Sequence, residues 1–258
     1  MKFSVKPQLL KFLVLGMGGL GLALRILLYA TGMDEKGLLV EGHWASTGIW
    51  LLTTAAALTI VLFTRPIEGP VDHRDCYPVS IAGGLGALAA AVAILIASIS
   101  EIGSVFMPVQ RVVCIFGFVT AAALVIIGLC RLTGAKAHFL LYGAVCLYFA
   151  LRMVSQYQIW SSDPQLMDYC FYLTAYVALM LTAYHHAAFG ADMGNHRMLW
   201  LFSLVAVYLC CLSLKGTRDT LLMLTCGIWA FTNLTSLTLR ARRQRPQLIL
   251  EEEPEEEV

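Results

Sequence analysis

Long apolar runs alternate with short polar connections along almost the whole chain. A helix needs about 20 apolar residues to cross about 30 Å of hydrocarbon. Runs of about that length occur at residues 8–30, 44–63, 79–100, 108–130, 137–157, 167–189, 197–214 and 219–239. The connections are brief, and several contain proline or glycine, which favour turns. The pattern therefore predicts an all-α membrane protein, a bundle of eight transmembrane helices.

The composition supports this class of protein. Hydrophobic residues make up 59% of the 258 residues, charged residues make up 14%, and the mean hydropathy is +0.73, whereas roughly 25% of residues in soluble domains are charged. We expect residues 1–245 to form one polytopic transmembrane domain and residues 246–258, which end in EEEPEEEV, to form a disordered acidic tail. The lipid bilayer is the expected partner. Nucleic acid is not, because the one basic run, RARRQR, lies where a helix would leave the membrane.

The Lys and Arg residues are unevenly divided between the two sides of the predicted bundle. Twelve lie on the side of the N-terminus: Lys2, Lys6, Lys11, Arg65, Arg74, Arg131, Lys136, Arg197, Arg240, Arg242, Arg243 and Arg245. Only Lys36, Lys215 and Arg218 lie on the opposite side. Because basic residues favour the cytoplasmic side, we predict cytoplasmic N and C termini and a multi-pass protein of the cytoplasmic membrane.

Three further arginines, Arg25, Arg111 and Arg152, fall inside predicted spans, all toward the non-cytoplasmic ends of their helices. Arginine at the centre of a membrane helix costs about 2.5 to 3.5 kcal/mol on insertion scales, so such residues usually face the bundle interior and find a partner. The alternative is that a side chain near a helix end reaches the lipid headgroups. The shared layer of the three arginines is the strongest indication of a polar site.

Polar and aromatic residues form a stripe on each of the fifth and sixth helices, at steps of three and four residues. The loop between these helices is short, so they are expected to be antiparallel neighbours in which Arg152 meets Asp168. A structural clamp explains such a pair as well as a ligand site does. The predicted ligand-binding residues are Arg25, Tyr29, Arg111, Arg152, Tyr157, Asp163, Asp168 and Tyr172.

The segments ALRILLYATGMDEK and ALRMVSQYQIWSSDPQLMD resemble one another at an offset of 127 residues, about half the chain. Each continues from Ala-Leu-Arg to an aromatic residue and then to an acidic loop. One interpretation is two parallel repeats of four helices, a plan that some transporters use. The other is chance similarity between apolar sequences.

Histidines and cysteines give no metal or catalytic pattern. Five of the six histidines fall on the predicted cytoplasmic side, without HxxxH or HExxH spacing, and the cysteines form no CxxC pair. We therefore assign no metal ligand, no catalytic residue and no cofactor, and we do not expect an enzyme. A haem- or metal-binding membrane enzyme that uses His138, His185 and His186 is kept as an alternative.

Two segments, YATGMDEKGLL and WSSDPQLMDYCFYLTAYVALMLTAYHHAAFGADMGN, carry a resemblance that extends over most of the chain. The sequence resembles a family of uncharacterised multi-pass membrane proteins of clostridia-like bacteria. This resemblance implies a bacterial cytoplasmic membrane and a helical membrane fold. It implies no activity and transfers no catalytic residue.

The leading hypothesis for function is a small-molecule permease or transport-associated protein with an outward-facing polar pocket. In it, Arg25 and Arg152 attract an anionic or zwitterionic ligand. The alternative to transport is a sensor or assembly subunit whose polar residues only lock helices together. A water-filled cavity that reaches the three arginines would distinguish the two. Both homo-oligomers and hetero-oligomers are compatible with the sequence.

Overall fold

The computed structural model describes residues 7–33, 39–40, 42–67, 77–103, 108–161, 169–215 and 219–237, with side chains from Leu9 onward. These residues form eight helices: α1 (Pro7–Thr31), α2 (Trp44–Thr64), α4 (Ile81–Ile102), α5 (Pro108–Thr133), α6 (Phe139–Trp160), α7 (Cys170–Gly190), α8 (His196–Leu212) and α9 (Thr220–Ser236). No helix end differs by more than three residues from its predicted position. The predicted acidic tail lies outside the described residues.

Five helices, α1, α2, α4, α5 and α6, are long and apolar enough to cross a membrane. The two helices α8 and α9 have 17 residues each, which corresponds to about 25 Å at a rise of about 1.5 Å per residue. The predicted all-helical fold is therefore confirmed for the described residues, and five of its helices could cross a membrane. Eight crossings and cytoplasmic termini stay predictions.

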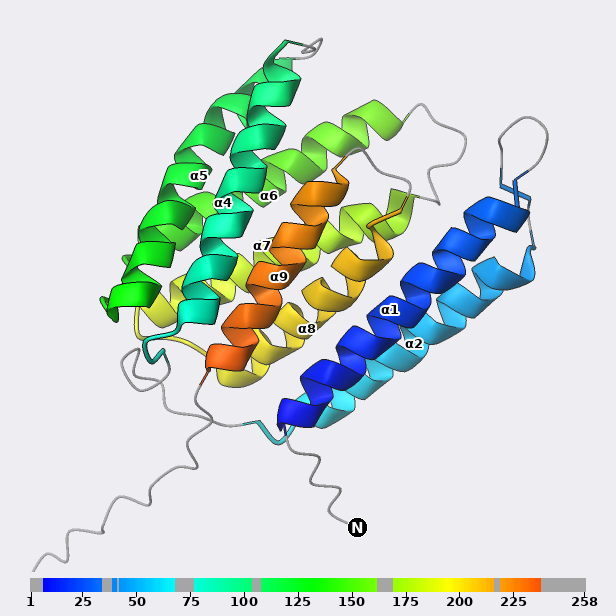
Figure 1. Ribbon diagram of the computed structural model, residues 1–258, viewed down its shortest axis with the longest axis horizontal. Coiled ribbons are helices and arrows are strands. Elements are labelled where there is room, and N and C mark those ends of the chain that lie inside the picture. The colour runs from blue at the N-terminus through cyan, green and yellow to red at the C-terminus, as the bar shows by residue number, and fades with distance from the viewer. Residues whose placement is uncertain are drawn as a thin grey trace, which may run out of the picture.

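The helices run up and down between two ends of the molecule (Figure 1). We call the end at which α1 begins the proximal end, and the opposite end the distal end. The helices α4, α6 and α8 also begin at the proximal end, whereas α2, α5, α7 and α9 begin at the distal end. Residues near the end of one helix therefore lie level with residues near the start of the next, which brings distant parts of the sequence to the same end.

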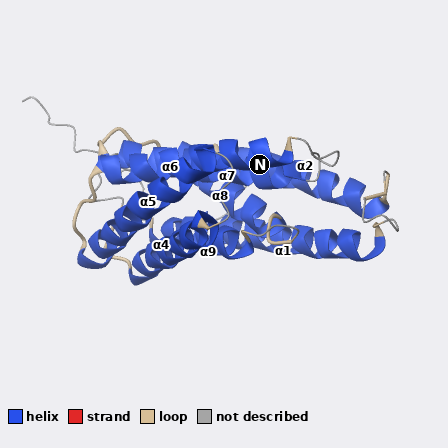
Figure 2. Ribbon diagram, turned by 90° about the horizontal axis from the view of Figure 1, so that it is seen from above, coloured by secondary structure: helices blue, strands red, loops and turns tan. Residues whose placement is uncertain are grey.

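The bundle is flattened, with α4, α9 and α1 along one side and α6, α7 and α2 along the other (Figure 2). Helix α4 packs on α5 and α9, and α6 packs on α5 and α7. The hairpin of α1 and α2 attaches to the remaining helices mainly through α8. Helix α6, the counterpart of α1 in the predicted repeat, thus packs on α5, whereas α1 packs on α8. The repeat stays a prediction.

Small residues bring α4 and α5 into close contact, as the Gly- and Ala-rich sequence of α4 indicates. A Cβ atom added to Gly84 would lie 2.6 Å from the Leu132 Cγ and 3.0 Å from the carbonyl oxygen of Gly128. Backbone therefore meets backbone at this crossing, and a side chain at Gly84 would push the helices apart.

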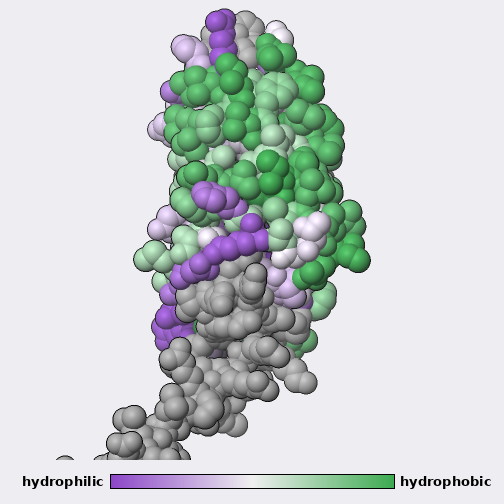
Figure 3. Space-filling model, turned by 90° about the vertical axis from the view of Figure 1, so that its left-hand side faces the viewer, coloured by the Kyte–Doolittle hydropathy of each residue, from purple (hydrophilic) through white to green (hydrophobic). Residues whose placement is uncertain are grey.

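Large apolar side chains cover the outside of the bundle. Leu51, Ile81 and Ile115 are each more than 60% exposed, although all three lie within helices. Figure 3 shows hydrophobic residues over most of one face between the two ends, and hydrophilic residues gathered toward the proximal end. Monomeric soluble proteins rarely expose so extensive an apolar surface. In a membrane, lipid would cover such a surface.

Candidate functional site

The structure brings together only some of the predicted ligand-binding residues. Arg25, Arg152 and Tyr172 are buried, with 2%, 2% and 1% of their surfaces exposed, and Tyr29 is half-buried. Arg111 and Tyr157 are exposed to the surroundings of the bundle. Two more predicted residues lie outside the described part of the chain: Asp163 and Asp168. Of the described residues, Arg152 and Tyr172 belong to one connected cluster.

Arg152 joins three helices at the distal end. Both of its Nη atoms donate hydrogen bonds to the Glu101 carboxylate near the end of α4, one to each oxygen. Its Nη2 atom also lies 2.7 Å from Oδ2 of Asp219, which precedes α9. The guanidinium group therefore bridges two carboxylates. This bidentate pairing with Glu101 needs the planar guanidinium group, which only arginine provides.

The Asp219 carboxylate collects further donors from α6 and α7. The Tyr172 hydroxyl donates to Oδ2 of Asp219, as does the Tyr176 hydroxyl at 3.0 Å, and the two hydroxyls lie 2.8 Å apart. The Gln156 amide lies 3.5 Å from the same oxygen. We call these six residues the distal cluster: Glu101, Arg152, Gln156, Tyr172, Tyr176 and Asp219.

Helical spacing explains how the cluster forms. Arg152 and Gln156 are four residues apart on α6, and Tyr172 and Tyr176 are four residues apart on α7, so each pair faces the same way. Asp219 occupies the N-cap position of α9, yet its side chain makes no capping hydrogen bond. An aspartate there usually accepts a hydrogen bond from the first turn, a contact that contributes about 1 kcal/mol. Here the carboxylate faces the cluster instead.

The distal cluster carries more negative than positive charge. Burial would raise the pKa of the Asp219 carboxyl, but Arg152 and the hydrogen bonds from Tyr172, Arg152 and Tyr176 hold that pKa below its ordinary value. Asp219 is therefore ionised at neutral pH. Two carboxylates against one guanidinium give the cluster a formal charge of −1.

Two donors near the cluster make no hydrogen bond within the described residues: the Tyr148 hydroxyl and Nε of Arg152. Tyr148 is fully buried and lies one turn before Arg152 on α6. Buried polar groups in proteins are normally satisfied, so an exception calls for an explanation such as a site that accepts a polar guest. The interior side of the cluster thus offers donors as well as carboxylates.

Arg25 lies in different surroundings. Its guanidinium carbon is 5.9 Å from the centre of the Tyr29 ring and 5.8 Å from that of Phe171. Phe171 and Tyr172 are consecutive on α7 and therefore point about 100° apart. The described ring contacts of Arg25 thus lie on another face of α7 from the one that meets the distal cluster. Among the described residues, the ring contacts of Arg25 and the hydrogen-bond partners of Arg152 have no residue in common.

Sequence reasoning missed the two carboxylate partners of Arg152. The predicted partner was Asp168, whereas Glu101 and Asp219 are the partners found among the described residues. Glu101 gave no signal, because the predicted span 79–100 ends one residue before it, whereas α4 extends to Ile102. Asp219 did have a signal, because it and Asp168 are the acidic residues inside the predicted spans, 219–239 and 167–189. The place of Asp219 at the first position of its span made it look like part of a loop.

The three histidines of the enzyme hypothesis lie in separate surroundings. His138 precedes α6 and accepts a hydrogen bond from the backbone N–H of Leu140. The His185 ring stacks on Phe202, and Nδ1 of His186 lies 2.7 Å from the Tyr77 hydroxyl. Among the described residues, no group of three or more His, Cys, Asp or Glu side chains is placed to hold a metal ion.

A cavity of about 170 Å³ lies between α1, α8 and α9. Apolar side chains and cysteines line it, including Leu15, Cys211, Met223 and Phe231, and no arginine does. The rings of Phe12 and Phe231 close the proximal side of the contact between α1 and α9. This cavity is suited to an apolar group, and none of its lining residues belongs to the distal cluster.

The chain matches no protein-family model, no curated protein and no solved structure. The resemblance to membrane proteins of clostridia-like bacteria therefore stays a prediction, and the function has to be inferred from the residues themselves.

Proposed function

We propose that this chain is a small-molecule permease or transport-associated membrane protein, and that the distal cluster is the polar site that its solute meets. The observation that carries the proposal is the Arg152 guanidinium, enclosed in an apolar bundle between the carboxylates of Glu101 and Asp219. Ionisable groups inside a membrane bundle are expensive, and they commonly mark the path of a solute, an ion or a proton.

The charge of the cluster narrows the class of solute. Arg152 alone would suit an anion, as the sequence suggested, but its two carboxylate partners already neutralise it and leave a formal charge of −1. A free anion would be repelled by this arrangement. A zwitterion fits both signs, because its ammonium group pairs with Asp219 or Glu101 while its carboxylate pairs with Arg152. We therefore propose a small zwitterion as the solute.

Solute binding would exchange ion pairs within the cluster rather than break them. In the structure the Arg152 guanidinium is held by Glu101 of α4 and by Asp219 before α9. A zwitterion that takes over one of these pairings keeps every charge compensated while the two helices separate. Tyr148 and Nε of Arg152 supply further donors for the solute carboxylate. The cost of burying a lone charge is avoided at each step.

A second candidate function is a sensor or assembly subunit in which the cluster is a polar lock. One observation favours it: the lining of the described cavity contains none of the cluster residues. The cluster then ties α4, α6, α7 and the start of α9 together and has no ligand.

A binding screen distinguishes the two functions. Purified protein in a non-ionic detergent is heated with a panel of amino acids and betaines, and the unfolding temperature is recorded. The permease proposal predicts that at least one zwitterion stabilises the wild type but not Asp219→Asn, and that this compound enters liposomes containing the wild type. Asp192→Asn is the matched control, since Asp192 forms an exposed ion pair with Lys136 at the other end. A panel without any stabilising zwitterion supports the lock.

A further inference from the structure

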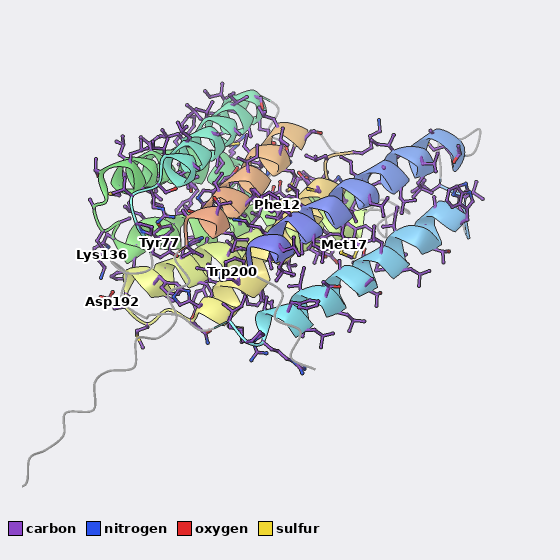
Figure 4. The ribbon with its side chains drawn as sticks, turned by 60° about the horizontal axis from the view of Figure 1, so that its bottom comes forward. Phe12, Met17, Tyr77, Lys136, Asp192 and Trp200 are labelled. Carbon is purple, nitrogen blue, oxygen red and sulfur yellow. The ribbon has the colours of Figure 1, made fainter. Side chains whose placement is uncertain are left out.

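A third buried arginine, Arg131, lies at the proximal end of the bundle, in the last turn of α5 and at the opposite end from the distal cluster. The distribution of basic residues along the sequence counted it only among the twelve on the side of the N-terminus and gave no indication of burial. The structure instead encloses it in the last turns of α5, where only 4% of its surface is exposed. Figure 4, in which the proximal end comes forward, shows Tyr77 among the side chains of this end, with Lys136 and Asp192 at its margin.

The partners of Arg131 are neutral. Its Nη2 atom donates to the Ser236 hydroxyl and, at 3.3 Å, to Oδ1 of Asn233, both on α9. Its guanidinium carbon lies 4.4 Å from the centre of the Tyr77 ring. Within the described residues no carboxylate pairs with it, since the ion pairs there involve Lys136 and Arg152. The positive charge is therefore buried without a described negative one.

Several buried donors around Arg131 make no hydrogen bond within the described part of the chain: Nε and Nη1 of Arg131 and Nδ2 of Asn233. All three are N–H groups, so the group that would satisfy them must supply acceptors. Native proteins rarely leave such donors unsatisfied. Their common polarity points to an acceptor-rich, negatively charged guest.

The start of α4 adds to the positive field. The backbone N–H of Ser80 donates to the Arg131 carbonyl oxygen at 3.1 Å, so the first turn of α4 is fixed beside the end of α5. A Cβ atom on Gly83 would lie 3.3 Å from Nη2 and 3.4 Å from Nε of Arg131. The guanidinium thus lies against a glycine in that first turn. Helix N-termini carry a partial positive charge, which disfavours a lone cation and favours an anion, although the N–H of Gly83 already donates to Oγ of Ser80.

We propose that Arg131, Asn233 and the first turn of α4 bind a phosphate-type oxyanion at the proximal end. Two sources have this chemistry: the headgroup phosphate of an anionic lipid, and free phosphate. The site shares no residue with the distal cluster. The proposal of anion binding therefore does not depend on the proposed transport function. Its occupant compensates the buried guanidinium and ties the ends of α5 and α9 to the start of α4.

The test measures the unfolding temperature of delipidated protein in a non-ionic detergent. One arm adds sodium phosphate and compares it with sodium chloride at equal ionic strength. The other adds micelles of short-chain phosphatidylglycerol and compares them with phosphatidylcholine. Stabilisation by phosphate alone identifies free phosphate, and stabilisation by phosphatidylglycerol alone identifies a lipid headgroup. No stabilisation in either arm overturns the proposal.

Asn233→Asp is the decisive variant. It is nearly isosteric, and it places a carboxylate where Oδ1 of Asn233 already lies 3.3 Å from Arg131. We expect this variant to unfold at a higher temperature than the wild type without any added anion, and its affinity for the anion to fall by about tenfold or more, as for the loss of a charge-assisted contact. An unchanged affinity for the anion overturns the proposal.

Three further variants test the remaining explanations. Arg131→Met removes the charge and should abolish the stabilisation, whereas Lys136→Met, at an exposed position of the same end, should keep it. Glu68, Asp72 and Asp75 precede Tyr77 in the sequence, and their combined change to Gln, Asn and Asn should leave anion binding intact. If that triple variant binds an anion that the wild type does not, a carboxylate of the chain itself neutralises Arg131 and the proposal is wrong.

Discussion

Nη2 of Arg152 lies 2.7 Å from Oδ2 of Asp219, and this contact joins the distal end of α6 to the residue that precedes α9. The same guanidinium holds Glu101 of α4, so one side chain connects three helices that are far apart in the sequence. The cluster around it is the part of the molecule in which charge, burial and helix contacts coincide.

Asp219→Ala should destabilise the protein much more than Asp192→Asn, in which asparagine tolerates the left-handed φ of 58° at position 192. The first change removes a carboxylate with an 8% exposed side chain and leaves Tyr172 and Tyr176 without their acceptor, at a cost of about 3 kcal/mol. The second removes an exposed ion pair with Lys136, worth up to about 1 kcal/mol. Unfolding of both variants in mixed micelles with denaturant measures the difference, and equal losses contradict the assignment of the distal cluster.

Arg152→Lys should fail to replace arginine. A lysine ammonium is a point charge and cannot present one donor to each Glu101 oxygen while a donor also reaches Asp219. We expect a loss of about 2 kcal/mol in the free energy of unfolding. Arg111→Lys is the control, because Arg111 is exposed, and it should change stability by less than about 0.5 kcal/mol. Similar changes in the free energy of unfolding of the two variants would show that the bidentate pairing of Arg152 with Glu101 does not contribute to stability.

Acid should weaken the wild type more than Asp219→Asn. Because the pKa of Asp219 is lowered in the folded state, its stabilising contribution is fully present above the ordinary aspartate value of about 4. It is lost as the pH falls below that value toward the lowered pKa, since the unfolded chain binds the proton first. Denaturant unfolding of both proteins between neutral and acidic pH tests this. Parallel pH profiles would contradict it.

Gly84→Ala should loosen the crossing of α4 and α5. The added methyl group would meet Leu132 and the Gly128 carbonyl oxygen, and overpacking of this kind costs about 1 to 3 kcal/mol. Gly143→Ala on α6 is the control, because a Cβ atom there has no neighbour within 4 Å and alanine favours a helix by up to about 1 kcal/mol. We therefore expect Gly84→Ala to lower the unfolding temperature and Gly143→Ala to raise it.

The sequence predicted the helices well because the length of an apolar run is a local property. The stripe on α7 was also visible, and Tyr172, Tyr176, Leu179, Thr182 and His186 are all buried as a stripe at helical spacing implies. Periodicity shows which face of a helix is buried. It does not show which other helix covers that face.

The partners of the buried arginines could not be predicted for this reason. Arg152 meets Glu101 and Asp219 from helices that are not its neighbours in the chain. Arg131 was counted among the basic residues on the side of the N-terminus, and nothing in the sequence indicated that α9 and the segment before α4 cover it. Charge counts along a sequence cannot distinguish a surface arginine from one that later helices enclose.

The most direct test of the central claim compares three matched compounds on the purified protein: an α-amino acid that stabilises it, the same molecule without the carboxyl group, and the same molecule without the amino group. The account predicts that only the intact zwitterion raises the unfolding temperature of the wild type, because both charges of the cluster must be met. It also predicts that this stabilisation is lost in Asp219→Asn and kept in Asp192→Asn. Equal stabilisation by all three compounds, or an unchanged response in Asp219→Asn, would contradict a zwitterion site at Arg152 and Asp219.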